Sequence, residues 1–587
     1  MHSDLLGRAW PSPTRPRTVH PRLRIRRFAW LIAMAVLVAI PSSGLPLAVA
    51  PVAPPIRTPD CPASTYPDVA ALLEVLPGAG YACAEELAAA LRPRADVALT
   101  DALLDMAAHG AHARARRNAL RVLGRFAEAP RGSRAHELVM RARASALRAT
   151  LAGLLATERD ASALADAIWL LDTFFYPDFG AGPALERLAS DTTLDPALRH
   201  RAALARARLV HSRPGVLSGA DRRFILTGLR ADDPGVRAAA ATAVAHLRTA
   251  QLDSGARAEL GAALAAARNA EPPLSLAADD PPPVGPAVSE SRPTPLTAAA
   301  AIARGQDRLA GGTAHLERLQ ADYETLALPY AHSGGGVRIR SGLPPARLAP
   351  LVADIEQAQE HFFSIVGSAL RAPIPGEETA ALTVLVFARQ GIYRDYLRAF
   401  TAFGVETDGV YDENTATVYT YARTAGQSEN RLEESLRHEL SHHLAGRHLF
   451  PGAWHTPGYH REPKGWADEG LAEMLAGSGP AGPALRRAQL QRLCARTTPP
   501  ALAGLLARRE GYDRFGQFDY DAAWALSFYL FTERPEGLRR LYRAYRDGSY
   551  RLGDWPHLVG APLATVERDW HAAITRWCVS HAPPGRT

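Results

Sequence analysis

The spacing of hydrophobic residues divides the chain into two regions of different character. Between about residues 65 and 270 the chain is rich in Ala, Leu and Arg, and its apolar residues recur at helical spacing with short breaks. Further along, Val337–Arg340 alternates as a strand does, and Thr383–Phe387 is a short apolar run typical of a buried strand. Helices are expected at 298–328, 345–367 and 392–400, and from 430 to the end. This order predicts a multidomain protein with an all-α N-terminal part and an α+β C-terminal part.

An internal repeat is visible in the helical region. Asp195–Arg199 reads Asp-Pro-Ala-Leu-Arg, and Asp233–Arg237 reads Asp-Pro-Gly-Val-Arg 38 residues later, each followed by a pair of alanines. The Asp suits the N-cap of a helix, and the Pro suits the first turn, where its missing N–H is not needed. A period of about 40 residues resembles HEAT-like helix-pair repeats, which implies an α-solenoid over 65–270. A helical domain without repeats is the alternative, because only two copies match clearly.

Residues 271–297 separate the two regions. Residues 271–296 contain eight prolines and four acids against one Arg, a composition typical of an extended, solvated linker. We therefore expect the main domain boundary there, with residues 298–580 forming the C-terminal domain.

The first 50 residues carry the pattern of a secretory signal peptide. Four arginines between Arg22 and Arg27 precede the apolar run Phe28–Ile40, and Ala48-Val49-Ala50 offers a small-residue cleavage site. The apolar run has 13 residues, whereas a membrane-spanning helix needs about 20. The prediction is export to a secreted or periplasmic location. An uncleaved N-terminal anchor, the only membrane contact expected, is the alternative.

Cysteine usage and charge narrow the picture further. Cys61–Cys83 and Cys494–Cys578 are the expected disulfides, one in each half of the chain, with four buried free thiols as the alternative. The formal net charge is +7, but residues 1–50 hold seven arginines and one acid, so removal of their +6 leaves +1. A chain with that balance exerts no global attraction on phosphates, so no nucleic-acid partner is expected.

The candidate chemistry begins with His438-Glu439-Leu440-Ser441-His442, an H-E-x-x-H sequence. On a helix, His438 and His442 lie one turn apart on one face and can reach the same metal ion. Glu439 lies about 100° further round the helix, beside the metal rather than on it. The alternative is a polar helix face with solvated histidines.

The sequence around this motif supports a helix. A capping box of Asn430 and Glu433 and a C-terminal stop at Gly446 are expected to bound it. A leucine stripe at i+4 spacing lies on roughly the opposite side from the two histidines and is expected to face the core: Leu432, Leu436, Leu440 and Leu444.

A second motif, Trp466-Ala467-Asp468-Glu469-Gly470-Leu471-Ala472-Glu473, begins 24 residues after His442. Together the two motifs resemble those of the gluzincin zinc metallopeptidases, the thermolysin- and aminopeptidase N-like (peptidase MA-like) group, over about residues 330–580. The resemblance implies that Glu469 is the third metal ligand, beside His438 and His442. Three such ligands leave a fourth position for water, so one catalytic Zn²⁺ per chain is expected. It also implies that Glu473 holds a ligand histidine through its other ring nitrogen, with Asp468 as the alternative.

Two further features follow from the resemblance. A Tyr or His downstream of the third ligand would stabilise the oxyanion; Tyr520 is the first choice, with Tyr529, Tyr512 and His460 as alternatives. A hairpin over 409–421 precedes the zinc helix, where the family places an edge strand that binds the substrate backbone. The chain has Gly-Val-Tyr-Asp-Glu-Asn over 409–414 instead of the aminopeptidase signature, which puts exopeptidase action in doubt.

The sequence thus predicts an exported zinc metallopeptidase that hydrolyses peptide or protein substrates, with Glu439 as the general base. The helical repeats offer a surface for a protein partner. Two alternatives stay open: a binding scaffold whose zinc domain is inactive or structural, and a zinc amidase that acts on cell-wall peptide.

Overall fold

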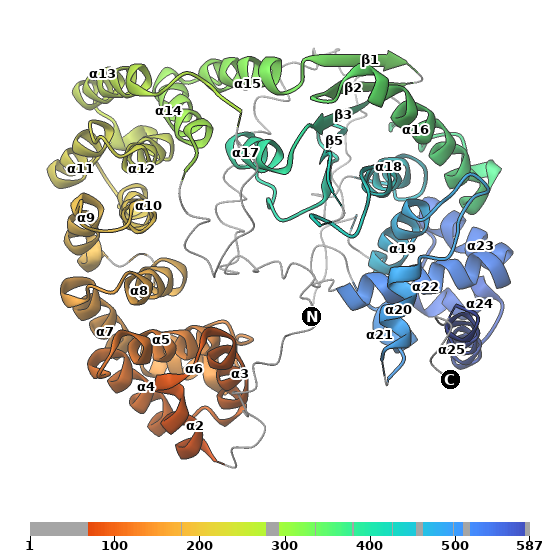
Figure 1. Ribbon diagram of the computed structural model, residues 1–587, viewed down its shortest axis with the longest axis horizontal. Coiled ribbons are helices and arrows are strands. Elements are labelled where there is room, and N and C mark those ends of the chain that lie inside the picture. Colours follow the sequence, from red (N-terminus) through yellow and green to blue (C-terminus); the bar gives the residue numbers. More distant parts are fainter. Residues whose placement is uncertain are drawn as a thin grey trace, which may run out of the picture. The chain divides into compact units, whose positions relative to one another are not determined.

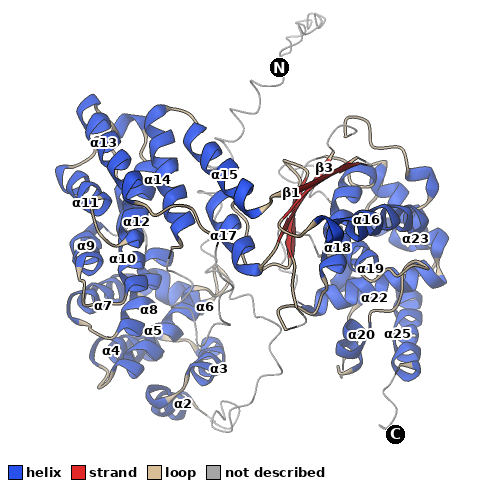
Figure 2. Cartoon of the chain, turned by 45° about the horizontal axis from the view of Figure 1, so that its top comes forward, coloured by secondary structure: helices blue, strands red, loops and turns tan. Residues whose placement is uncertain are grey.

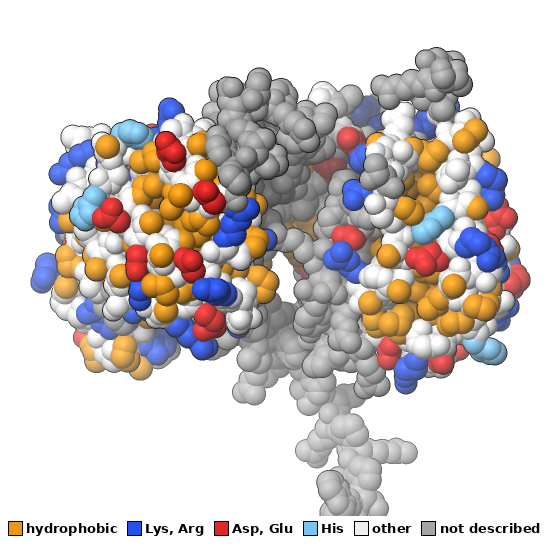
Figure 3. All heavy atoms as spheres, turned by 90° about the horizontal axis from the view of Figure 1, so that it is seen from below, with side chains coloured by type: hydrophobic (Ala, Val, Ile, Leu, Met, Phe, Trp, Pro, Cys, Tyr) orange, Lys and Arg blue, Asp and Glu red, His pale blue; other side chains and the backbone are white. Residues whose placement is uncertain are grey.

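The computed structural model describes residues 68–581, except 176, 178, 277–292, 335, 378–380, 425, 453–458, 460, 461, 497 and 509–516. The predicted signal peptide and Cys61 lie outside the described residues. The chain forms two compact units, Met1–Ala184 and Leu185–Thr587. No described helix is long and apolar enough to cross a membrane. On the face drawn in Figure 3, basic and acidic side chains are interspersed over the described surface.

The first unit is helical (Figure 1). Asp68, Asp96 and Asp160 each cap a helix by accepting a hydrogen bond from a backbone N–H of its first turn. The buried Asn118 donates to the carbonyl oxygens of Leu76 and Ala79 and ties the start of the unit to its centre. Its described α-helices before α9 are α2 (Val69–Val75), α3 (Tyr81–Leu91), α4 (Val97–His109), α5 (Ala113–Ala127), α6 (Arg134–Glu137), α7 (Ala144–Thr157) and α8 (Ala161–Phe174).

The helices that open the second unit lie in two rows (Figure 1). Helix α12 packs against α10 and α14 in one row, and α11 and α13 lie in the other with α9. Their bounds are α9 (Gly182–Ser190), α10 (Pro196–Ser212), α11 (Gly219–Leu229), α12 (Pro234–Ala245), α13 (Ser254–Ala270) and α14 (Pro295–Ala310).

The repeated sequence performs the local roles expected of it. Asp195 and Asp233 are the N-caps of α10 and α12, and each has Pro at the first helical position. The paired alanines of both copies are fully buried, which lets α10 and α12 approach closely. The assignment of these helices to HEAT-like repeats stays a prediction.

Helix α14 follows the Pro-rich segment. It packs against helices that precede this segment in the sequence and against elements that follow it. Ala298, Ala301 and Ile302 share a core with α12 and α13. Leu296 and Ala300 belong to another core, which extends to the sheet. The two compact units divide after Ala184, and the domain boundary expected at 271–297 stays a prediction.

The sheet of the second unit is mixed and has the strand order β1-β2-β3-β5-β4. Strand β2 is parallel to β3 and β3 to β5, whereas the edge strands β1 and β4 are antiparallel to their neighbours. The strands are β1 (Tyr330–Gly334), β2 (Val337–Ser341), β3 (Leu382–Phe387), β4 (Gly409–Asp412) and β5 (Thr417–Tyr421).

Alternate residues of β3 enter two different cores. Val384 and Val386 pack with α16 (Pro345–Val366) and α18 (Leu432–His448), whereas Leu385 and Phe387 pack with α15 (Ala314–Ala327) and α17 (Gln390–Phe400). The sheet is therefore covered on both faces, as Figure 2 shows for α16, α18 and α17. The mostly helical second unit with its small mixed sheet agrees with the predicted α+β class.

The remaining helices surround α18 and α19 (Gly465–Ala476). A disulfide between Cys494 and Cys578 joins α20 to α25, as predicted. Cys83 is also disulfide-bonded. The other helices are α20 (Arg487–Cys494), α21 (Leu502–Leu506), α22 (Gln517–Glu533), α23 (Pro535–Arg546), α24 (Trp555–Val559) and α25 (Leu563–Ser580).

Three local predictions are wrong. The helix expected at 298–328 is two helices, because Gly311 ends α14 in the left-handed conformation with φ 75°. The capping box of α18 consists of Arg431 and Glu434, one residue beyond the predicted pair. The same helix runs through Gly446 to His448, because φ of this glycine stays outside the left-handed region that would end a helix.

Candidate metal centre

Helix α18 presents its leucine stripe to the core and its histidines to the other side. Leu436 and Leu440 are fully buried, and Leu432 and Leu444 are nearly so. The side chains of His438 and His442 keep 18% of their surface exposed. The predicted orientation of this helix is confirmed.

Helix α19 brings Glu469 against the two histidines. The Nε2 atoms of His438 and His442 lie 3.2 Å apart, and Glu469 Oε2 lies 3.4 Å from the first and 3.7 Å from the second. Two donors that each bind a tetrahedral zinc at about 2 Å are about 3.3 Å apart. The three donor atoms therefore have the spacing that one such ion requires, and they form a metal-ligand cluster among the described residues.

Glu469 Oε2 gives a second indication of a cation. It is buried and accepts no hydrogen bond from the described residues. A buried carboxylate oxygen that accepts no hydrogen bond is costly, and coordination by a metal ion removes that cost. The residues present thus fit the predicted zinc.

Close packing of α19 on α22 sets the position of Glu469. A Cβ on the next residue, Gly470, would lie 2.5 Å from the backbone oxygen of Ala523 and against Ser527. Only glycine allows this approach, which explains the residue after the ligand in the second motif.

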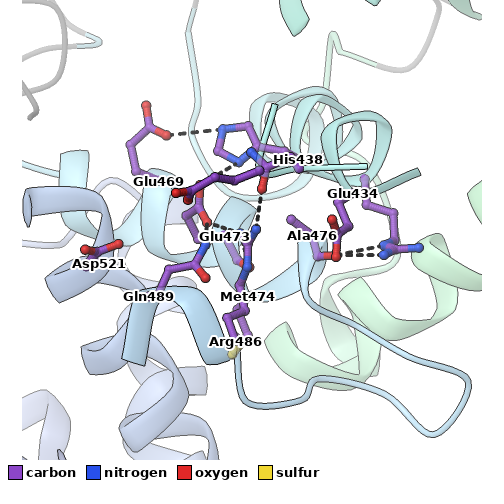
Figure 4. Close-up of polar contacts among 12 residues, drawn as sticks. Glu434, His438, Glu469, Glu473, Met474, Ala476, Arg486, Gln489 and Asp521 are labelled. Atoms are coloured by element: carbon purple, nitrogen blue, oxygen red, sulfur yellow. Dashed lines mark hydrogen bonds and ion pairs between the residues drawn. The ribbon is translucent and has the colours of Figure 1, made fainter. Parts of the chain in front are cut away.

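Glu473 contacts His438 at Nδ1, the ring nitrogen that does not face the other two donor atoms. Its Oε1 lies 3.4 Å from His438 Nδ1, and its Oε2 accepts a hydrogen bond from Arg486. Arg486 also donates to Asn430 Oδ1 at 2.6 Å. Figure 4 shows Glu473 between His438 and Arg486. Burial raises the pKa of Glu473, but Arg486 and His438 outweigh it and lower the pKa to about 2.

Asp468 contacts the second histidine in the same way. Its Oδ1 lies 3.0 Å from His442 Nδ1. The sequence offered Asp468 only as an alternative to Glu473, but the structure places one carboxylate beside each imidazole. A carboxylate on Nδ1 holds the proton there and leaves Nε2 free as a metal ligand.

Glu439 lies beside the cluster, and its side chain is buried against the edge strand β4. A Cβ on Gly409, the first residue of β4, would lie 3.0 Å from Glu439 Cγ and 3.2 Å from its Oε1. Burial raises the pKa of Glu439, whereas the charges of His438 and His442 and then a hydrogen bond from the backbone of Tyr411 lower it. The net shift is upward, which suits a carboxylate that accepts a proton near neutral pH.

Tyr520 on α22, the first choice for the oxyanion residue, lies within the electrostatic influence of the carboxylates of this cluster. The carboxylate of Glu469 and then burial raise its pKa well above the usual range, so the hydroxyl keeps its proton and can donate it. The alternative Tyr529 is buried and accepts from Arg534 Nε at 2.9 Å. Tyr512 and His460 lie outside the described residues.

Comparison with known proteins shows that the region around this cluster is similar to bacterial collagenases. Residues 286–566 match the model of the collagenase family, peptidase family M9. Similar curated proteins are collagenase ColQ1 of Bacillus cereus strain Q1 and collagenase ColA of Clostridium perfringens, each 28% identical, over 256 and 236 residues. These matches cover 40% and 39% of this chain. Collagenase ColT of Clostridium tetani is 29% identical over 154 residues, 25% of this chain.

The chain spans only 26%, 21% and 15% of the length of these three relatives. Collagenases of this family are zinc metalloproteases, which confirms zinc as the predicted cofactor. The match supports a zinc metallopeptidase domain in the C-terminal half. The gluzincin assignment stays a prediction.

Proposed function

We propose that this chain is an exported zinc metallopeptidase that hydrolyses peptide bonds within protein substrates. The convergence of His438 Nε2, His442 Nε2 and Glu469 Oε2, with the Glu439 carboxylate beside them, supports this function most directly. The relatives are named collagenases, so collagen and its denatured form are the first substrates to test. Export rests on residues 1–50, and N-terminal sequencing of protein from the culture medium would check it.

The roles follow from the positions of the side chains. His438, His442 and Glu469 would hold the zinc, which supplies a water of lowered pKa and polarises the substrate carbonyl. Glu439 would take the proton from that water on a carboxylate oxygen and pass it to the leaving amine. Tyr520 would donate its hydroxyl proton in a hydrogen bond to the oxygen on which negative charge develops.

Strand β4 supplies a place for the substrate backbone. It is the last strand of the sheet. One of its edges pairs with β5, and the opposite edge is the outer edge of the sheet. A peptide added to the outer edge would run past Gly409, whose missing side chain lets Glu439 lie close against the strand. Strand addition of this kind binds backbone, which agrees with cleavage inside a protein chain.

The test replaces Glu439 by Gln, which keeps the shape of the side chain and removes its basicity. Loss of a general base costs about 10²–10⁴-fold in rate, so cleavage of gelatin and of a peptide mixture should fall by that factor. Zinc content should stay near one per chain, because Glu439 is not among the three ligands. Glu433→Gln, on the same helix and outside the cluster, is the matched control and should cleave at the wild-type rate.

The outcomes separate the alternatives. A Glu439→Gln variant as fast as wild type would refute the assigned general base. If wild type binds zinc and cleaves no protein or peptide, the proposal fails in favour of the scaffold. Cleavage of cell-wall peptide alone would favour the amidase.

A further inference from the structure

His443 follows the second ligand histidine and contacts the edge strand instead of the metal cluster. Its side chain is buried on α18, and its Nδ1 lies 3.1 Å from the hydroxyl oxygen of Tyr411 on β4. The two rings meet edge to face, with centroids 5.5 Å apart and an angle of 83° between their planes. This contact therefore has both a hydrogen bond and aromatic packing.

Arg447 determines which way the hydrogen bond runs. Its Nε lies 3.1 Å from His443 Nε2, closer than the 3.5 Å to Nδ1. A guanidinium can only donate, so Nε2 must be the unprotonated acceptor. The ring proton then sits on Nδ1 and is donated to Tyr411. Arg447 is itself held by the backbone oxygen of Glu377.

The positions of His443 and Glu439 along α18 indicate what the contact with Tyr411 does. His438 and His442 are four residues apart and face the metal cluster. Glu439 and His443 are also four residues apart, and they share a neighbouring face of the helix. Both contact β4: Glu439 contacts Gly409 and the backbone of Tyr411, and His443 contacts the side chain of Tyr411.

We propose that His443 is a positioning residue that fixes β4 to α18 through Tyr411. It thereby sets the distance between the strand that receives the substrate backbone and the carboxylate of Glu439. The H-E-x-x-H-H sequence would then contain two interleaved pairs, one for the metal and one for the edge strand. The effect on substrate rests on the proposed function, whereas the attachment of β4 to α18 does not.

Enzyme kinetics test the proposed effect of His443 on substrate binding. His443→Leu and Tyr411→Phe each remove the hydrogen bond, and a net hydrogen bond corresponds to about a 3- to 10-fold change. The KM for a peptide substrate should rise by that factor, with a smaller change in kcat, and zinc content should stay at the wild-type level. The double variant should be no worse than His443→Leu, because that change has already removed the hydrogen bond that Tyr411→Phe removes. His443→Asn places an amide N–H near the position of Nδ1 and should recover most of the loss.

Hydrogen exchange tests the second part without any need for activity. The amides of 409–412 should exchange faster in His443→Leu and in Tyr411→Phe than in wild type. Tyr545→Phe is the matched control, because it loses a buried hydrogen bond to Pro463 O away from β4. Its exchange in 409–412 and its KM should equal those of wild type.

The two measurements fail separately. If exchange is faster in the two variants but the wild-type protein cleaves nothing, the attachment of β4 to α18 stands and the proposed function falls. Unchanged exchange and unchanged KM in Tyr411→Phe, which alters only one hydroxyl, would overturn the inference even if His443→Leu fails to fold. Additive effects in the double variant would also overturn it.

Discussion

Glu473→Gln should weaken zinc binding although Glu473 lies outside the ligand set. The change keeps the shape of the side chain but replaces the carboxylate that holds His438 Nδ1 at 3.4 Å by a neutral amide. Loss of such a partner typically costs 10- to 100-fold in metal affinity, or about 1.4 to 2.8 kcal/mol. Asp468→Asn should cost more, because Asp468 lies 3.0 Å from His442 Nδ1.

The same change has a second effect, on stability. Arg486 has a side chain only 7% exposed, and without the Glu473 carboxylate its charge is buried unpaired. Breaking a buried pair from one side costs about 3–5 kcal/mol. The double variant Glu473→Gln/Arg486→Met removes the unpaired charge. It should recover stability in the zinc-free protein while its zinc affinity stays low.

Competition with a chromophoric chelator gives the zinc affinity, and denaturant unfolding of the chelated protein gives the stability. Glu536→Gln, an exposed change on α23, is the control and should leave both quantities unchanged. Wild-type zinc affinity in Glu473→Gln would refute the role of Glu473. A double variant that regains zinc affinity together with stability would show that the loss was a folding defect.

The remaining predictions concern stability. Cys494→Ser opens a disulfide that spans 84 residues, which by loop entropy stabilises the fold by about 4.6 kcal/mol; denaturant unfolding should show a loss of that order, and an unchanged midpoint would contradict it. Burial, followed by the charge of His246, lowers the pKa of His211 to about 4 from 6.5. The unfolded chain therefore takes up a proton first, so the stability contributed by the neutral imidazole is complete above pH 6.5 and lost as pH falls toward 4. Unfolding titrations of His211→Gln should show a flatter pH dependence in this window, and a slope equal to wild type would contradict the assignment.

Local patterns predicted the elements whose determinants are local. The leucine stripe and the two histidines of α18 are read from a period of about 3.6 residues, and the structure keeps their orientation. The sequence does not predict strand β1, because its residues are mostly exposed and show no alternation of apolar and polar side chains. This strand forms by pairing with the edge of β2. The residues Tyr330–Gly334 alone contain no pattern that indicates this pairing. The Gly311-Gly312 pair that separates α14 from α15 was a readable signal.

The site shows the same limit. Glu469 came from a motif resemblance, and its geometry depends on the close packing that Gly470 permits. Arg486 was not predicted, because it precedes α20 and meets Glu473 only after the two helices pack. His443 carried a signal, since it lies four residues after Glu439, but the identity of its partner on β4 required the sheet.

The charges around the cluster explain why this helix pair favours a divalent cation. Burial alone would lower the pKa of His438, yet Glu469 and Glu473 raise it well above the usual range. Burial likewise lowers the pKa of His442, but Asp468 and Glu469 raise it to about 9. The carboxylates thus stabilise positive charge at the place where the two Nε2 atoms meet, and Arg486 is drawn to Glu473 on the far side of His438. A zinc ion places two positive charges at this point. It binds the lone pairs of the imidazole nitrogens, which protons would otherwise occupy. The surrounding carboxylates and the spacing of the three donor atoms therefore both favour a zinc ion.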